Sequence, residues 1–103
     1  MEKLTIVKVG GNVINNAEAL QVFLADFSQL QGHKILVHGG GKRATQLASD
    51  LGVEAKLIEG RRVTDEATLD IVTMVYAGLL NKNITATLQK FNCNALGLSG
   101  ADG

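Results

Sequence analysis

Two kinds of hydrophobic spacing alternate along the chain, and they predict strands and helices in turn. Apolar, β-branched runs at 4–9 and 34–38, and a further run at 94–99, are typical of buried strands. Apolar residues at helical spacing follow at 16–31, 44–51, 65–80 and 82–91. Alternation from residue 53 to residue 57 predicts an antiparallel hairpin that turns near Glu59 and Gly60.

The predicted order is β-α-β-α-hairpin-α-α-β, which indicates an α/β fold. We expect an open, mainly parallel sheet sandwiched by helices. Asn15 or Asn16 is the expected first cap, and Thr64 or Asp65 caps the third helix. From Ile71 to Leu80 only Thr73 is polar, so that helix is apolar on more than one face. It either lies inside the fold or meets a second subunit.

Composition narrows the possible classes of protein. The chain has 103 residues, enough for one domain, and its formal net charge is zero, which gives no sign of nucleic-acid binding. No apolar run is long enough to span a membrane. Cys93 is the single cysteine, which fits a reducing cytoplasm, and His33 and His38 have no companions that would predict a metal site. The ending GLSGADG leads us to expect a piece of a longer protein.

Two glycine clusters follow the first two predicted strands. Gly10 and Gly11 end one strand, and 39–41 (GGG) end the next and open a helix. Ligands of open α/β sheets bind beyond the carboxyl ends of the strands. Glycine lets a ligand approach the backbone, and free N–H groups at a helix start favour an anion. Lys42 and Arg43 add positive charge. The alternative is a tight strand-to-helix turn without a ligand.

Known phosphate motifs fit these glycines poorly. A P-loop is absent, because Gly41 and Lys42 are followed by Arg43 rather than Ser or Thr. Gly39, Gly41 and Ala44 do fit the dinucleotide pattern G-x-G-x-x-A, with Glu59 about twenty residues on. This partial match keeps the dinucleotide-binding half of an NAD(P)-dependent oxidoreductase open as an alternative.

Two cations are placed unusually. Lys8 interrupts the first apolar strand just before its glycines. An unpaired buried ammonium is costly, so Lys8 either lies on an edge strand, where lysine deters pairing, or reaches over the sheet end to a negatively charged ligand. Arg61 and Arg62 follow the predicted turn and face opposite ways on a strand. One of them can hold a carboxylate in bidentate fashion, and the pattern leaves open which one does.

Four segments together resemble the acetylglutamate kinases of the amino acid kinase family. They are VKVGG at 7–11, VHGGG at 37–41, GRRVTD at 60–65 and GLSGADG at 97–103, in that family's order and spacing. The resemblance implies phosphorylation of the side-chain carboxylate of N-acetyl-L-glutamate, or a related N-acylglutamate, by ATP with Mg²⁺ in arginine biosynthesis.

The resemblance also implies roles for particular residues. Lys8 matches the catalytic lysine that stabilises the transferring phosphoryl group, and Gly10 and Gly11 match the loop beneath the phosphates. Gly40 and Gly41 match the substrate-binding glycines. Arg62 matches the arginine that holds the substrate's α-carboxylate. The family usually has Leu or Met where this chain has Arg61, which leaves the accepted acyl group open.

The resemblance finally implies an organisation. Residues 1–103 would be the N-terminal, substrate-binding and dimerisation portion, with the nucleotide-binding half absent and no turnover by this portion alone. We expect a cytoplasmic homodimer joined through the helix from Asp65 to Leu80, with neither nucleic acid nor membrane as a partner. A non-catalytic dimerisation module built on the same fold is a further alternative.

Overall fold

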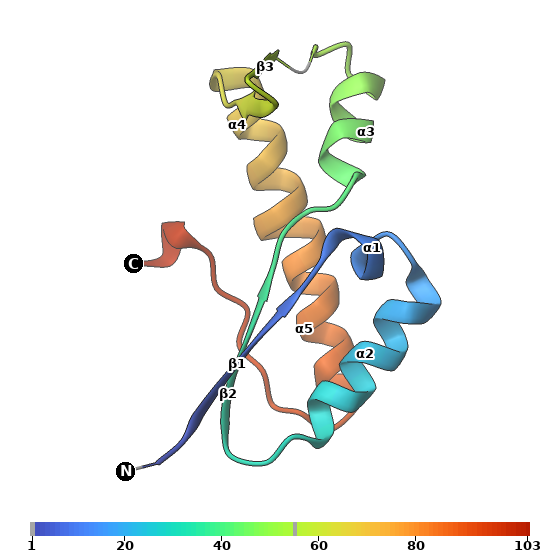
Figure 1. Ribbon diagram of the computed structural model, residues 1–103, viewed down its shortest axis with the longest axis vertical. Coiled ribbons are helices and arrows are strands. Elements are labelled where there is room, and N and C mark those ends of the chain that lie inside the picture. Colours follow the sequence, from blue (N-terminus) through green and yellow to red (C-terminus); the bar gives the residue numbers. More distant parts are fainter. Residues whose placement is uncertain (1, 55) are drawn as a thin grey trace.

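The computed structural model describes residues 2–54 and 56–103, without the side chains of Lys56 and Arg62. Its strands, helices and turns follow one another along the chain as Figure 1 shows. The elements are β1 (Leu4–Val9), α1 (Gly11–Ile14), α2 (Ala17–Gln29), β2 (His33–His38), α3 (Arg43–Asp50), β3 (Lys56–Ile58), β4 (Arg61–Val63), α4 (Glu66–Val72), the π-helix η1 (Thr73–Leu80), α5 (Asn81–Lys90) and the 3₁₀ turn η2 (Gly100–Asp102).

β1 and β2 form a parallel pair, as their apolar sequences predict. Their register runs from Leu4 opposite His33 to Val9 opposite His38. The inward face carries Val7 and Leu36, which pack on the first core cluster from α2 and α5. That cluster consists of Leu24, Phe27, Ile84 and Leu88.

The cap of α2 at its start is the predicted one, and its end is held by a lysine. Asn16 accepts a hydrogen bond from the amide of Ala19 at 3.1 Å and is the N-cap. At the other end, the Lys34 ammonium donates to three carbonyls, those of Phe27 at 2.8 Å, Ser28 at 3.1 Å and Leu30 at 2.7 Å. A cation at this position also complements the negative end of the helix dipole.

One long helical rod replaces the two helices predicted between residues 65 and 91. α4, η1 and α5 follow one another without a break from Glu66 to Lys90. Asp65 caps the rod by accepting from the amide of Thr68 at 2.9 Å. No proline interrupts the chain, so nothing forces an end near residue 81. The rod also packs on α3 through a second cluster, Ala44, Ala48, Ile71 and Val75.

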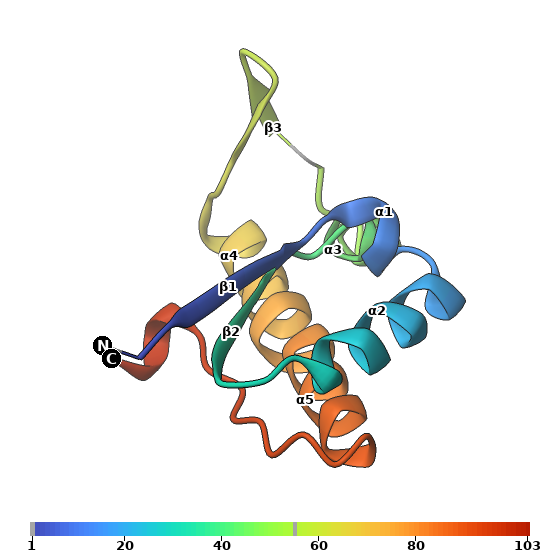
Figure 2. The ribbon, with the colours of Figure 1, turned by 60° about the horizontal axis from the view of Figure 1, so that its bottom comes forward.

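β3 and β4 pair antiparallel, with Ile58 opposite Arg61. The connecting residues Glu59 and Gly60 have φ values of 51° and 78°, as a two-residue turn of this twist requires. The pair projects from the body of the molecule, which Figure 2 shows clearly.

The prediction of a third core strand at 94–99 is wrong. This segment carries no strand pairing, and Leu96 is 82% exposed. Two side chains of α5 donate hydrogen bonds to the carbonyls of this segment instead. Gln89 donates to the carbonyl of Ala95 at 2.8 Å, and Lys82 donates to the carbonyl of Gly97 at 2.9 Å. The segment is therefore attached to the helix and not to an edge of the sheet.

The sheet is also smaller and more open than predicted. In the described residues each sheet has two strands, and helices cover one face of the β1–β2 pair. Leu4, Ile6, Ile35 and Val37 on the other face are each at least 45% exposed. The radius of gyration is 15.0 Å, against about 13 Å for a compact chain of this length. No helix in the described part of the chain is long and apolar enough to cross a membrane.

Candidate functional site: two glycine turns at the carboxyl edge

The two predicted glycine clusters meet at one edge of the parallel strands. β1 and β2 end level, at Val9 and His38, so Gly10 and Gly39 leave the sheet side by side. A Cβ built on Gly11 would lie 3.6 Å from the Cα of Gly41, which is ordinary van der Waals contact. The sequence prediction that both clusters belong to one place is therefore confirmed by their contact.

Gly40 and Gly41 are confined from two sides. A methyl group on Gly40 would overlap the ring of Tyr76, which comes from the helical rod. One on Gly41 would overlap the Asn15 side chain, and Gly41 also has φ of 56°, a conformation that favours glycine. Only glycine fits both positions without movement of a neighbour.

Asn15 links the two turns directly. It follows α1, the single helical turn after Gly10, and its Oδ1 accepts a hydrogen bond from the amide of Lys42 at 2.9 Å. Sequence reasoning considered Asn15 only as a helix cap. The bond joins residues far apart in the chain, so no local spacing could have revealed it.

Lys8 lies on the open face of the sheet. The alternation along β1 places it with Leu4 and Ile6, away from the helices, and its side chain is exposed. It stands opposite Val37, two residues before Gly39. Among the described residues it forms no hydrogen bond or ion pair, and its predicted catalytic role stays a prediction.

The predicted role of Arg62 in holding the substrate's α-carboxylate stays a prediction. Its backbone pairs with Leu57 in the β3–β4 pair, but its side chain lies outside the described residues. Arg61 is exposed. Whether this hairpin approaches the substrate also stays a prediction.

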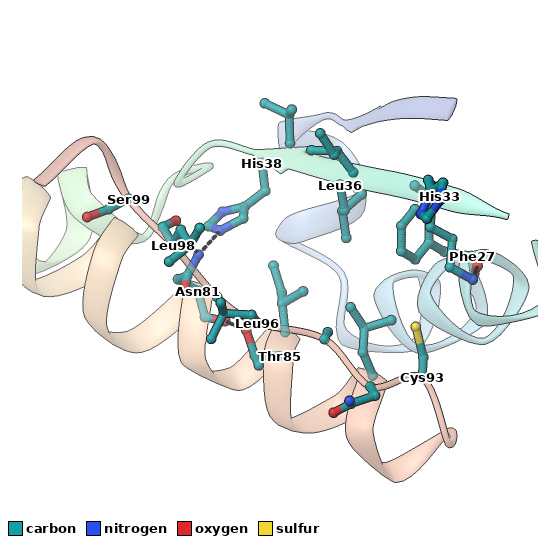
Figure 3. A pocket seen from close by; sticks show the side chains of 18 of the residues that line it. Phe27, His33, Leu36, His38, Asn81, Thr85, Cys93, Leu96, Leu98 and Ser99 are labelled. Carbon is teal, nitrogen blue, oxygen red and sulfur yellow. Dashed lines mark hydrogen bonds between the residues drawn. The ribbon is translucent and has the colours of Figure 1, made fainter. Parts of the chain in front are cut away.

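A polar cluster that sequence reasoning missed lies behind the second glycine turn. His38 and Asn81 contact each other at one end of a cavity of about 820 Å³ that lies between β2, α5 and residues 93–100 (Figure 3). The distance from His38 Nε2 to Asn81 Nδ2 is 3.2 Å, and from His38 Nδ1 to Gly39 O it is 2.8 Å. A signal existed in the sequence, because Asn81 is the first polar residue after the apolar run that ends at Leu80.

The last motif, GLSGADG, forms a closed turn. The Asp102 carboxylate accepts from the amide of Ser99 at 2.7 Å and from its hydroxyl at 3.1 Å. These bonds, the backbone one first, lower the pKa of Asp102, and the positive charge of Lys82 acts in the same direction. The carboxylate of this exposed turn is therefore kept ionised.

The described residues contain no group of three or more His, Cys, Asp or Glu side chains that could hold a metal ion. What the site does offer is backbone: a Cβ built on Gly10 or on Gly39 would meet nothing within 4 Å. Anionic groups can approach such amides closely, and the cations Lys8, Lys42 and Arg43 lie on neighbouring segments. A parallel βα edge with two such glycine turns is typical of the class of open α/β fold whose ligands bind beyond the carboxyl ends of the strands.

Comparison with known proteins identifies that class. The amino acid kinase family matches residues 3–103, and the chain belongs to this family. It is 63% identical over 102 residues to the acetylglutamate kinase of Cytophaga hutchinsonii, covering 99% of this chain and 39% of that protein. The acetylglutamate kinase of Parabacteroides distasonis is 57% identical over 102 residues, covering 99% of this chain and 40% of that protein. The chain thus spans about two fifths of the length of these relatives.

Solved structures agree on the fold. The smu.665 protein of Streptococcus mutans UA159 matches with a TM-score of 0.70 at 24% identity, covering 89% of this chain and 38% of that one. N-acetylglutamate synthase from Neisseria gonorrhoeae, complexed with coenzyme A and N-acetyl-glutamate, matches with a TM-score of 0.66 at 26% identity, covering 85% of this chain and 21% of the synthase chain.

Proposed function

We propose that this chain is the N-terminal, substrate-binding portion of an enzyme that phosphorylates the side-chain carboxylate of N-acetyl-L-glutamate, with ATP as donor, in arginine biosynthesis. The observation that carries the proposal is the contact between the turns at Gly11 and Gly41. The similarity to relatives named acetylglutamate kinase, at 63% and 57% identity, supports the choice of substrate.

The proposed chemistry suits a site made of amides and cations. A glutamate side chain has a pKa of about 4.3, so the nucleophile is already ionised at neutral pH and no general base is needed. The difficulty is to bring two anions together while charge spreads over the phosphoryl oxygens. Positioning and electrostatic stabilisation therefore supply most of the catalysis.

Each predicted residue has one task in this proposal. Gly40 and Gly41 contact the substrate, and Arg62 holds its α-carboxylate. Gly10 and Gly11 lie beneath the phosphates. Lys8, on the exposed sheet face two residues before Gly10, stabilises the negative charge of the phosphoryl group.

The open backbone at Gly10 fits the phosphate end of ATP, which would supply the phosphoryl group when bound. Mg²⁺ usually keeps several waters and binds through phosphates and one or two carboxylates. An assembled protein ligand set on this portion is therefore not required for Mg²⁺ to take part.

The whole protein is proposed to be a cytoplasmic homodimer, with the rod from Asp65 to Leu80 at its interface. In it, further chain would extend the sheet and cover its open face, and would carry the nucleotide-binding half. Relatives are about two and a half times as long as this chain, so we expect no kinase turnover from residues 1–103 alone.

Binding to the 103-residue chain tests the proposal. We expect N-acetyl-L-glutamate to shift the amide resonances of Gly40 and Gly41, and Arg62→Ala to weaken its affinity roughly ten- to a hundredfold through loss of a charge-assisted pair. Arg61→Ala is the matched control and should leave the affinity unchanged. Equal losses from both variants, or no binding at all, would contradict the proposal.

The oxidoreductase alternative is tested with NADH fluorescence, and the kinase proposal expects no binding. The oxidoreductase alternative needs Glu59 beside the glycines. Glu59 instead lies at the turn of the projecting hairpin, which disfavours that alternative (Figure 2).

Replacing Lys8 by Met in a longer protein that carries the nucleotide-binding half should lower kcat by about 10²–10³. Near-normal turnover would instead favour a non-catalytic module.

A further inference from the structure

We infer that Asn81 is a positioning residue for the Gly39–Gly41 turn, acting through His38. The inference rests on the proposed function, because it takes this turn to be the part that contacts the substrate. The contacts involved are the hydrogen bonds of His38 and Asn81, and Figure 3 shows the one that joins the two side chains.

Geometry fixes the orientation of the Asn81 amide. Its Nδ2 lies 3.1 Å from the Leu98 carbonyl, which only accepts, and its Oδ1 lies 3.0 Å from the Lys82 ammonium, which only donates. If Oδ1 and Nδ2 were exchanged, the amide oxygen would face the Leu98 carbonyl oxygen, and the amide NH₂ group would face the Lys82 ammonium. Both neighbours therefore direct the Asn81 NH₂ group toward His38.

The same reasoning fixes the tautomer of His38. The Asn81 NH₂ group can only donate, so Nε2 at 3.2 Å must accept and carries no proton. The Gly39 carbonyl at 2.8 Å can only accept, so Nδ1 must carry the proton. The hydrogen bonds therefore assign His38 the tautomer whose Nδ1–H is directed at the first carbonyl of the glycine turn.

The Asn81 end of this connection is buried, and its polar atoms all have partners, whereas His38 is half-buried. Asn81 is 8% exposed, and both of its NH₂ hydrogens and its oxygen have partners. The Asn81 side chain lies close to the backbone of Gly97, because a Cβ added there would overlap it. The carbonyl of Gly39 is thereby attached to the helical rod just before the residues proposed to meet the substrate.

Nitrogen NMR of the wild-type chain tests the tautomer without any ligand. At a pH of about 8.5, where free imidazole is neutral, two-bond ¹H–¹⁵N correlations should show His38 protonated at Nδ1. His33 is the internal comparison, since its Nε2 faces the Glu2 carboxylate at 2.5 Å and should carry the proton. Finding His38 protonated at Nε2 would overturn the inference.

Substitution tests the coupling to the turn. Asn81→Asp replaces the donor by an acceptor, so His38 should change to the Nε2–H tautomer and the amide resonances of Gly39–Gly41 should shift. The matched control is Asn83→Asp, an exposed site on the same helix, which should change neither. Unshifted glycine resonances in Asn81→Asp would contradict the coupling.

A second pair of variants covers the case in which Asn81→Asp does not fold. His38→Gln keeps an acceptor for Asn81, whereas His38→Leu removes it. The Leu variant should weaken N-acetyl-L-glutamate binding by about tenfold, the loss of roughly one hydrogen bond, and Gln should restore most of it. Equal affinity of the Gln and Leu variants for N-acetyl-L-glutamate would refute the positioning role of Asn81.

The failure of the proposed function can be told apart from the failure of this inference. If the wild type binds no N-acetylglutamate, the proposed function fails, while the tautomer of His38 still decides the hydrogen-bond assignment.

Discussion

At the scale of single residues, Gly40 is the glycine of the site with the least room for a side chain, because an added Cβ would overlap the ring of Tyr76. Gly40 is buried, and any side chain there would have to displace an aromatic ring packed on the second core cluster. The same contact that shapes the candidate site therefore contributes to the stability of the fold.

We expect Gly40→Ala to lower the free energy of unfolding by about 1–3 kcal/mol, because the added methyl group overpacks against Tyr76. Urea denaturation followed by circular dichroism measures the change. The control is Gly39→Ala, where a Cβ meets nothing within 4 Å and the effect should stay within about 1 kcal/mol of the wild type. Equal destabilisation by the two variants would show that the ring contact is unimportant.

The glycines themselves could be predicted from the sequence, but their neighbours could not. Three glycines after a strand indicate a backbone site whatever surrounds them. Tyr76 and Asn15 reach that site from elements distant in sequence, and no spacing rule brings them there. The pair of His38 and Asn81 was missed for the same reason, since the polar position after the apolar run was visible but no spacing rule brings these two residues together.

At the scale of elements, local signals predicted what local energetics determine. The caps Asn16 and Asp65 depend on neighbours within a few residues, and the first two apolar runs form strands because each has the other as its partner. The strand predicted at 94–99 failed because a strand needs a partner, and α5 side chains take up its carbonyls instead. The continuous rod was missed because a polar residue, here Asn81, can lie inside a helix as well as end one.

Lys34 offers a test at this scale, because it closes the carboxyl end of α2. Lys34→Met keeps most of the apolar stem but loses three hydrogen bonds and the favourable charge, so we expect about 1–2 kcal/mol of destabilisation. Lys90→Met is the control: Lys90 also lies at the end of a helix, α5, and its Nζ is 5.8 Å from the centroid of the Phe91 ring, but among the described residues it donates no hydrogen bond to a helix carbonyl. The midpoints of urea denaturation of the two variants are compared with that of the wild type to test the capping role of Lys34. A midpoint for Lys34→Met equal to that of the control would contradict the capping role.

At the scale of the whole molecule, apolar side chains are exposed in several places, and two of these bear on assembly. One is the open sheet face with Ile6, and the other is the rod, where Leu69, Met74 and Leu79 are each at least 41% exposed. Exposed apolar surface of this kind is typical of contacts with further protein. The sequence predicted the second place from the excess of apolar residues in the rod, whereas the first appears only once helices are found on one side of the sheet.

The two surfaces make different predictions about assembly, which sedimentation velocity can separate. If the rod is the dimer interface, Met74→Glu places a charge in it and should convert dimers to monomers, because an unpaired buried carboxylate is costly. Ile6→Glu puts the same charge on the sheet face and should leave the dimer intact, as should Asn83→Glu on an exposed polar position of α5. Dissociation by Ile6→Glu alone would locate the contact on the sheet face and refute the rod interface. A wild-type chain that sediments as a monomer at all concentrations would refute self-association through either surface.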